Sequence, residues 1–216
     1  TVCLFSFGVN AQKKSELKSQ LSLLKYSAVV EYGQSFRYGD RSVTSPYDMI
    51  KGGINVEFPI HRYGFGIETG LKYNYGFGKR EQLYAHNGKA KYDYSAHLVD
   101  IPVRLTFTLP LFWDIKLYTF AGANLNIGLS HTEEVKFSQK KVKGITNVLP
   151  YPKSGTYNLY ENDYSRLNFQ LGAGGGLQWK QYRIRGGYDW GLNDLYTLNA
   201  RTERMKGWYI GFEYQF

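Results

Sequence analysis

Ser95 and His97 are the two side chains in this sequence whose types and spacing best suit catalysis. They lie two residues apart, so on an extended strand both point to the same face. A serine hydroxyl beside an imidazole can act as an activated nucleophile in acyl transfer when a third group orients the base. No acidic residue is evident in that orienting role. We therefore interpret His97 as a structural histidine on a strand face and predict no catalytic residues.

The other histidines suggest no metal or cofactor site. Ser130 and His131 are adjacent, so they point to opposite faces of a strand, while His61 and His86 fall in a separate turn and loop. Four histidines without close Asp or Cys neighbours do not make a metal site. The glycine-rich run 172–176 lacks both the Lys-Ser/Thr pair and the helix that complete a phosphate-binding loop. We predict no metal and no cofactor.

Three tyrosines remain as candidate binding residues: Tyr151, Tyr157 and Tyr160. All three fall in segment 132–163, the longest predicted loop, and long loops are where binding residues concentrate. Their rings could stack on carbohydrate. This is the one ligand-binding site that the residues themselves suggest.

The composition favours a membrane protein built from strands. No run of 18 apolar residues is present, charged residues make up 21% and mean hydropathy is −0.43, which excludes ordinary membrane-spanning helices. Tyr numbers 20 and Gly 24, as suits a barrel with aromatic belts and a crowded interior. One cysteine, Cys3, allows no disulfide framework.

The net charge of +9 does not indicate a nucleic-acid partner. The Lys and Arg residues form no single stripe or basic helix, and many fall in predicted loops. Basic loops would be attracted to the phosphates of a membrane surface. Simple solvated loops are the alternative interpretation.

The first residues resemble targeting sequence. Residues 2–9 are apolar, and Val9-Asn10-Ala11 fits the small-x-small rule for signal cleavage. We expect 1–11 to be the remainder of a secretory signal and 12–25 to be a periplasmic lead-in. A buried N-terminal strand is the alternative for the first segment.

Residues 26–216 contain eight segments with strand-like alternation: 26–37, 48–60, 63–79, 91–109, 114–131, 164–179, 182–196 and 204–216. The links between them alternate between short turns and long loops. This alternation is typical of outer-membrane barrels, with periplasmic turns and external loops. We predict an all-β, antiparallel, eight-stranded transmembrane up-and-down β-barrel in the bacterial outer membrane, with both termini periplasmic. Strands 63–79 and 91–109 exceed the length of a membrane crossing, so we expect them to project beyond it. Pro102 forfeits a ladder donor, which predicts a bulge.

Charged residues on one face of these strands indicate which face is the lumen. A soluble barrel has the opposite sense, with apolar side chains inside, and alternation alone does not distinguish the two. The lumen of an eight-stranded barrel is just wide enough for side chains, and unpaired buried charges are very costly. We therefore predict a paired network that plugs the barrel. Its members are Glu31, Glu57, Glu68, Lys72, Asp100, Arg104, Lys116, Arg183, Arg185, Asp189 and Glu213.

The last strand has large apolar residues at every second position: Trp208, Ile210, Phe212, Tyr214 and Phe216. It resembles the terminal strand that closes outer-membrane barrels and that the barrel-assembly machinery reads as a signal.

Two further stretches resemble the PorT-like outer-membrane β-barrel family. One is Leu98-Val99-Asp100-Ile101-Pro102-Val103-Arg104-Leu105, and the other is the strand–turn–strand of 168–195. The ending Gly211-Phe212-Glu213-Tyr214-Gln215-Phe216 also fits. Asn168 stands where that family usually has an acidic residue. The resemblance implies an eight-stranded outer-membrane barrel, and one branch of the family serves a secretion pathway.

Taken together, the residues predict a non-enzymatic protein with a structural or recognition role, or an accessory subunit of an envelope or secretion assembly. Its expected partners are outer-membrane lipid, including lipopolysaccharide, the barrel-assembly machinery and other envelope proteins. The alternatives are an envelope-lipid-modifying enzyme, a small channel and a soluble ligand-binding barrel.

Overall fold

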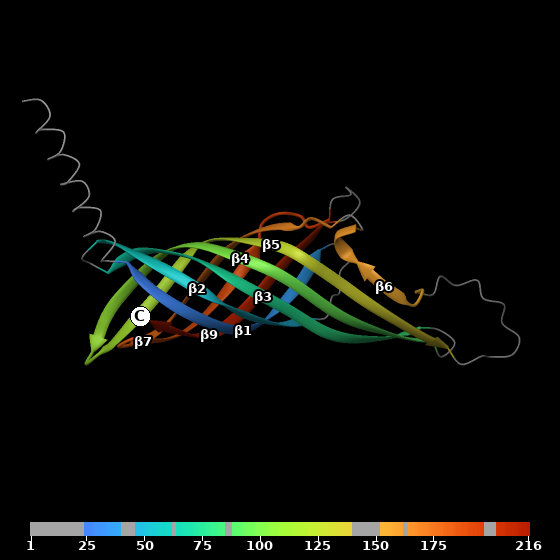
Figure 1. Ribbon diagram of the computed structural model, residues 1–216, viewed down its shortest axis with the longest axis horizontal. Coiled ribbons are helices and arrows are strands. Elements are labelled where there is room, and N and C mark those ends of the chain that lie inside the picture. Colours follow the sequence, from blue (N-terminus) through green and yellow to red (C-terminus); the bar gives the residue numbers. More distant parts are fainter. Residues whose placement is uncertain are drawn as a thin grey trace, which may run out of the picture.

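The computed structural model describes residues 24–39, 46–61, 64–84, 88–139, 152–161, 164–196 and 202–216. Within them the chain forms nine strands and one 3₁₀ turn (Figure 1). The strands are β1 (Lys25–Gly39), β2 (Tyr47–His61), β3 (Phe65–Tyr84), β4 (Gly88–Phe112), β5 (Ile115–Gln139), β6 (Gly155–Asn158), β7 (Leu167–Trp179), β8 (Tyr182–Gly191) and β9 (Glu203–Gln215), and the turn is η1 (Leu159–Glu161). The predicted signal and nearly all of the lead-in lie outside the described residues.

Eight of the nine strands form a closed ring. Each pairs antiparallel with its sequence neighbours, β5 pairs with β7, and β1 pairs with β9 to complete the circle. The short β6 pairs with β5 alone and stands outside the ring. The predicted all-β, antiparallel, up-and-down barrel is therefore confirmed. No helix among the described residues is long and apolar enough to cross a membrane.

The two ends of the barrel differ. At the end that we call the short-turn end, tight turns at Trp113-Asp114 and Lys180-Gln181 join neighbouring strands. Lys25 and Gln215 lie at this end, where the main-chain N–H of Gln215 donates to the main-chain carbonyl of Gln181 at 2.8 Å. The opposite end, the long-loop end, carries the longer connections and β6 (Figure 1).

The wall alternates between exposed apolar side chains and buried polar ones. Val30, Ile54 and Ile184 on the outer face are about 60% exposed (61%, 59% and 60%), whereas Glu68 on the inner face is 0% exposed. This polarity is the reverse of a soluble barrel, because lipid solvates the outer face and polar side chains fill the lumen. The soluble-barrel alternative is therefore wrong.

Three strands continue past the ring at the long-loop end: β3 and β4, as their lengths predicted, and also β5, which was not predicted to do so. We call this part the projecting sheet; it comprises 78–84 of β3, 88–97 of β4, 130–139 of β5 and β6. Its inner face carries a small apolar cluster of Ala90, Tyr92 and Val135. On β5 an extra residue at Leu129 shifts the register opposite His97 and Leu98, and there β5 leaves β7 and takes β6 as its neighbour.

The bulge predicted at Pro102 is wrong. Pro102 pairs in register with Asn124 of β5, and the β3 register is the same before and after it. The β3 ladder instead lacks the pairs between Thr69–Val103 and Lys72–Asp100. A proline removes one donor, and this sheet tolerates the missing bonds without an inserted residue.

Candidate functional site

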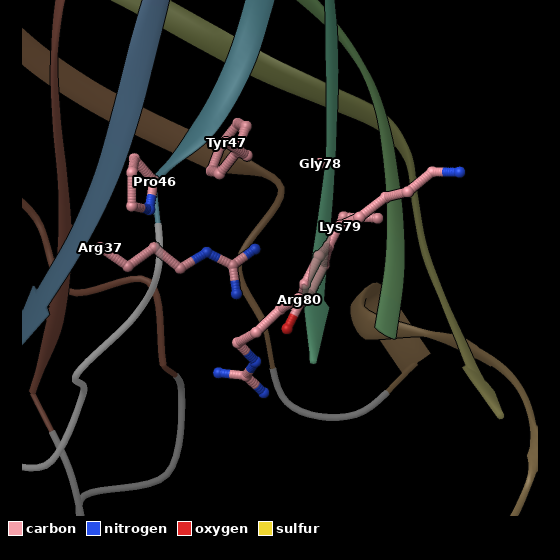
Figure 2. A pocket seen from close by; sticks show the side chains of 7 residues that line it. Arg37, Pro46, Tyr47, Gly78, Lys79 and Arg80 are labelled. Carbon is pink, nitrogen blue, oxygen red and sulfur yellow. The ribbon is translucent and has the colours of Figure 1, made fainter. Parts of the chain in front are cut away.

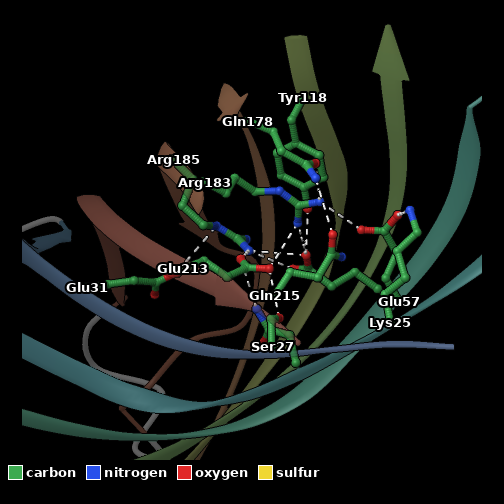
Figure 3. Close-up of polar contacts among 12 residues, drawn as sticks. Lys25, Ser27, Glu31, Glu57, Tyr118, Gln178, Arg183, Arg185, Glu213 and Gln215 are labelled. Atoms are coloured by element: carbon green, nitrogen blue, oxygen red, sulfur yellow. Dashed lines mark hydrogen bonds and ion pairs between the residues drawn. The ribbon is translucent and has the colours of Figure 1, made fainter. Parts of the chain in front are cut away.

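The centre of the lumen is organised by Arg185 of β8. Its Nη1 donates to Glu68 Oε1 at 3.0 Å and to Glu213 Oε2 at 2.7 Å, and its Nε lies 3.5 Å from Glu31 Oε1 (Figure 3). All four side chains are almost completely buried. One guanidinium therefore bridges carboxylates from three different strands, as a planar fork of five donors allows.

Arg183 forms a second node toward the short-turn end. Its Nη2 donates to Glu57 Oε2 and its Nη1 to Glu213 Oε1, both at 3.0 Å. The guanidinium carbon lies 3.7 Å from the centre of the Tyr118 ring, and the Tyr118 hydroxyl donates to Glu68 at 2.6 Å. Cation–π contact and hydrogen bonds together offset the loss of hydration.

A third group of ion pairs lies toward the long-loop end. Lys51 Nζ lies 2.9 Å from Asp100 and 3.9 Å from Asp189, and Arg104 Nη2 lies 3.3 Å from the same Asp189. Lys72 adds a second cation to the central group, because its Nζ donates to Glu31 at 2.8 Å. The network thus runs along the lumen rather than being a single pair.

The structure buries ten of the eleven residues predicted for the network and exposes one, Lys116. Lys116 points to the lumen side of β5, but it lies next to the turn at Trp113-Asp114, where water reaches it. Lys51 was missed and is buried with two acidic neighbours. Alternation could have found it, because Lys51 and Glu57 lie on the same face of β2.

Aromatic rings fill the space that the ion pairs leave. Tyr118, Phe120 and Tyr209 form a buried cluster, and the Arg104 and Arg185 guanidiniums lie over the Phe120 ring at 4.6 and 4.5 Å. A cavity beside Lys51 has about 10 Å³, room for about one water molecule. The described lumen therefore contains no wide passage at these levels.

The Ser95–His97 pair lies on the outer face, as predicted. The His97 ring contacts Tyr73 and Tyr75, with ring centres 6.1 and 5.2 Å away, and its Nδ1 lies 2.5 Å from the Tyr73 hydroxyl. Its nearest polar partner is thus a tyrosine of the outer wall and not Ser95. This geometry suits an aromatic belt at a membrane interface.

The mouth at the long-loop end holds a second polar cluster. Arg37 Nη1 lies 3.5 Å from Glu203, which also accepts from the Tyr164 hydroxyl at 2.9 Å. Arg37 Nη2 lies 2.9 Å from Nε2 of His131, which the bulge in β5 directs inward. Sequence reasoning missed this cluster, because its members come from four segments and share no spacing.

The three tyrosines predicted to bind a ligand differ in their surroundings. Tyr151 lies outside the described residues. Tyr157 is 37% exposed, and its hydroxyl donates to the Lys153 carbonyl at 3.0 Å. Tyr160 packs edge-on against His131, with ring centres 5.9 Å apart, and burial raises the pKa of its hydroxyl to about 12. Of the two described tyrosines, Tyr157 is exposed and Tyr160 is half-buried.

The outer face of β9 carries the predicted terminal-strand residues. Trp208, Ile210, Phe212 and Phe216 are 36%, 54%, 49% and 75% exposed, and Tyr214 packs on Tyr182 with ring centres 5.4 Å apart. No group of three or more potential metal ligands occurs among the residues that the structure describes.

A family model described as the outer membrane protein beta-barrel domain matches residues 6–197. The chain belongs to this family. As a member, it is a protein of the bacterial outer membrane.

Solved structures similar to this outer-membrane barrel share little sequence with it. Ail of Yersinia pestis, in complex with the heparin analogue sucrose octasulfate, is 15% identical with a TM-score of 0.42, covering 89% of this chain and 99% of Ail. Neisserial surface protein A is 11% identical with a TM-score of 0.47 (89% and 97% covered). The outer membrane enzyme PagL is 11% identical with a TM-score of 0.40 (86% and 98% covered). Among curated proteins, none matches this sequence.

Proposed function

We propose that this barrel is a closed, non-enzymatic protein whose work is recognition through its long-loop end, alone or as an accessory subunit of an envelope or secretion assembly of the kind that PorT-like barrels serve. The filled lumen is the observation that carries the proposal. Side chains that bridge strands across the lumen, such as Arg185 and Arg183, occupy the path that a solute would take. Among the described residues, the projecting sheet offers a surface beyond the ring.

We further propose that the long-loop end faces the outside and both termini face the periplasm. This orientation is supported by the short turns, which share one end of the barrel with Lys25 and Gln215, as is usual in outer-membrane barrels.

Cysteine labelling of whole cells tests the orientation. A membrane-impermeant maleimide should label Lys91→Cys in the projecting sheet and leave Lys180→Cys in a short turn unlabelled, because only the first would face the outside. Both side chains are equally exposed (57%), so a difference in labelling reports the side of the membrane. The unsubstituted protein controls for Cys3. Labelling of Lys180→Cys in intact cells, with Lys91→Cys silent, would reverse the proposed orientation.

Recognition is tested by affinity purification from native outer membrane in mild detergent. We expect other envelope proteins to be recovered in stoichiometric amounts, and Lys89→Glu/Lys91→Glu to reduce their recovery, since both lysines lie on the projecting sheet and pair only with Glu81 among the described residues. Lys180→Glu, at an exposed side chain of the opposite end, is the control. Recovery of the barrel alone would contradict the accessory role.

The channel alternative makes a different prediction. In a planar bilayer the wild-type barrel should give no single-channel steps, because buried ion pairs and aromatic rings occupy its lumen. Regular steps would support a channel instead. The enzyme alternative would be supported if purified barrel changed lipid A and Ser95→Ala abolished that change; we expect lipid A to stay unmodified.

A further inference from the structure

Among the described residues, the edge of β3 loses its β2 partner where the ring ends. Pairing of β2 with β3 stops at Asp48–Phe77. Pro46, which immediately precedes β2, has no N–H to donate to β3. Among the described residues, Gly78–Tyr84 then pair with β4 only. In the described part of the barrel, an unpaired edge of β3 therefore lies at this point between the interior mouth and the outer face.

Two cavities meet across this free edge. The inner one lies at the mouth and is lined by Arg37, Tyr47 and Arg80, among others (Figure 2). The outer one is an open groove on the membrane-facing wall and includes Ile50, Tyr75 and Phe77. Three residues line both cavities: Gly78, Lys79 and Tyr94. The inner cavity has about 10 Å³, room for about one water molecule, so a molecule in the outer groove could reach its mouth and the side chains there without entering it.

The inner cavity is basic and has an uncommitted cation. The Arg80 guanidinium stacks over the Tyr92 ring at 4.6 Å, its Nε is buried, and it forms no hydrogen bond or ion pair within the described residues. Arg37 adds positive charge, although Glu203 and His131 engage its donors. In Figure 2 the Arg37 and Arg80 guanidiniums lie on one side of β3, while Lys79 points to the other side.

The outer groove combines apolar and aromatic side chains with three charged ones, Asp48, Lys79 and Asp93. Ile50 is 45% and Tyr75 37% exposed, and Phe77 stacks on Tyr75 with ring centres 5.6 Å apart. The two acidic residues of the groove are already partnered: Asp48 accepts from Tyr32 and Gln34, and Asp93 lies 3.9 Å from Lys79. An anionic group at Arg80 is therefore not opposed by a free carboxylate in the groove.

We propose that a phosphate-bearing lipid of the leaflet on the long-loop side binds across the free edge of β3, with its phosphate against Arg80 and an acyl chain along Ile50, Tyr75 and Phe77. Arginine suits a phosphate because its planar fork can donate two parallel hydrogen bonds. Burial of the acyl chain in the outer groove adds a hydrophobic contribution to the binding free energy. The site goes beyond the recognition role and depends only on the location of the barrel in a membrane.

Native mass spectrometry of barrel extracted from outer membrane in mild detergent tests the site. Wild type should retain one phosphate-bearing lipid. Arg80→Gln should lower the retained fraction at least about tenfold, because a charge-assisted hydrogen bond is lost. Ile50→Ser should lower it as well, by loss of apolar contact. Lys136→Gln, on the same sheet but exposed and paired with Glu134, is the matched control and should retain lipid like wild type.

Competition distinguishes a lipid from a soluble anion. Excess inorganic phosphate or a water-soluble sugar phosphate should not displace the lipid, because neither fills the outer groove. Displacement by either, together with unchanged retention in Ile50→Ser, would overturn the proposal in favour of a soluble-anion site. Equal retention by Arg80→Gln and wild type would also overturn it. Each variant is first shown to be folded by the mobility shift of intact barrels in gels. The planar-bilayer and affinity-purification experiments test the proposed function separately, so failure of the lipid site and failure of that function are distinguishable.

Discussion

Replacing Arg185 with methionine is expected to destabilise the barrel by about 3–5 kcal/mol, the usual result of removing one partner of a buried ion pair. Glu31, Glu68 and Glu213 would lose their shared counter-charge while remaining buried. Methionine keeps much of the side-chain volume, so the loss would report charge more than packing. The measurement is urea unfolding of barrel refolded into lipid vesicles, followed by tryptophan fluorescence or gel mobility.

Lys116→Met is the matched control for this experiment. It removes one positive charge from the same face of the wall, but Lys116 is exposed, so its loss should change stability by less than about 0.5 kcal/mol. Adding Glu68→Gln to Arg185→Met should recover part of the loss, since one fewer uncompensated carboxylate remains. Equal stability of Arg185→Met and Lys116→Met would contradict the account of the lumen given above.

Gly174→Leu is expected to prevent folding or to cost about 3 kcal/mol or more, at the upper end of what overpacking a core costs. A Cβ at this position would overlap the Gly186 carbonyl oxygen of β8 and the Phe120 ring, which also supports the Arg104 and Arg185 guanidiniums. The backbone oxygen cannot move without breaking the β7–β8 ladder. The yield of folded barrel, measured by gel mobility after refolding into vesicles, reports the effect.

Gly52→Leu supplies the comparison. Gly52 lies on the outer face of β2, and a Cβ there meets no atom within 4 Å, so leucine should be accommodated against lipid. A barrel that folds equally well with either substitution would show that close packing between β7, β8 and Phe120 is not required.

The fold could be predicted because alternation is a local property. In 101–109 the outward side chains are apolar and Arg104 and Thr106 point inward, and the structure exposes Val103 and Leu105 while burying Arg104 and Thr106. Strand direction and turn length followed from the same spacing, so the eight-stranded ring and its two unlike ends were accessible from residues 26–216. The error at Pro102 was of a different kind: a missing donor is visible in sequence, but the response of the sheet to it depends on the neighbouring strands.

Alternation along each strand assigns side chains to the lumen, whereas the register between strands decides which of those side chains meet. Arg185 and Glu68 are 117 positions apart, and their contact is set by the register of every strand pair around the closed ring. The depth of each residue along the axis follows from the same register, which is why Lys51 is buried between two acidic residues and Lys116 reaches water. The meeting of two cavities at Gly78 likewise depends on β2 ending before β3 does. Alternation repeats every two residues along one strand, whereas register and closure are properties of the whole sheet.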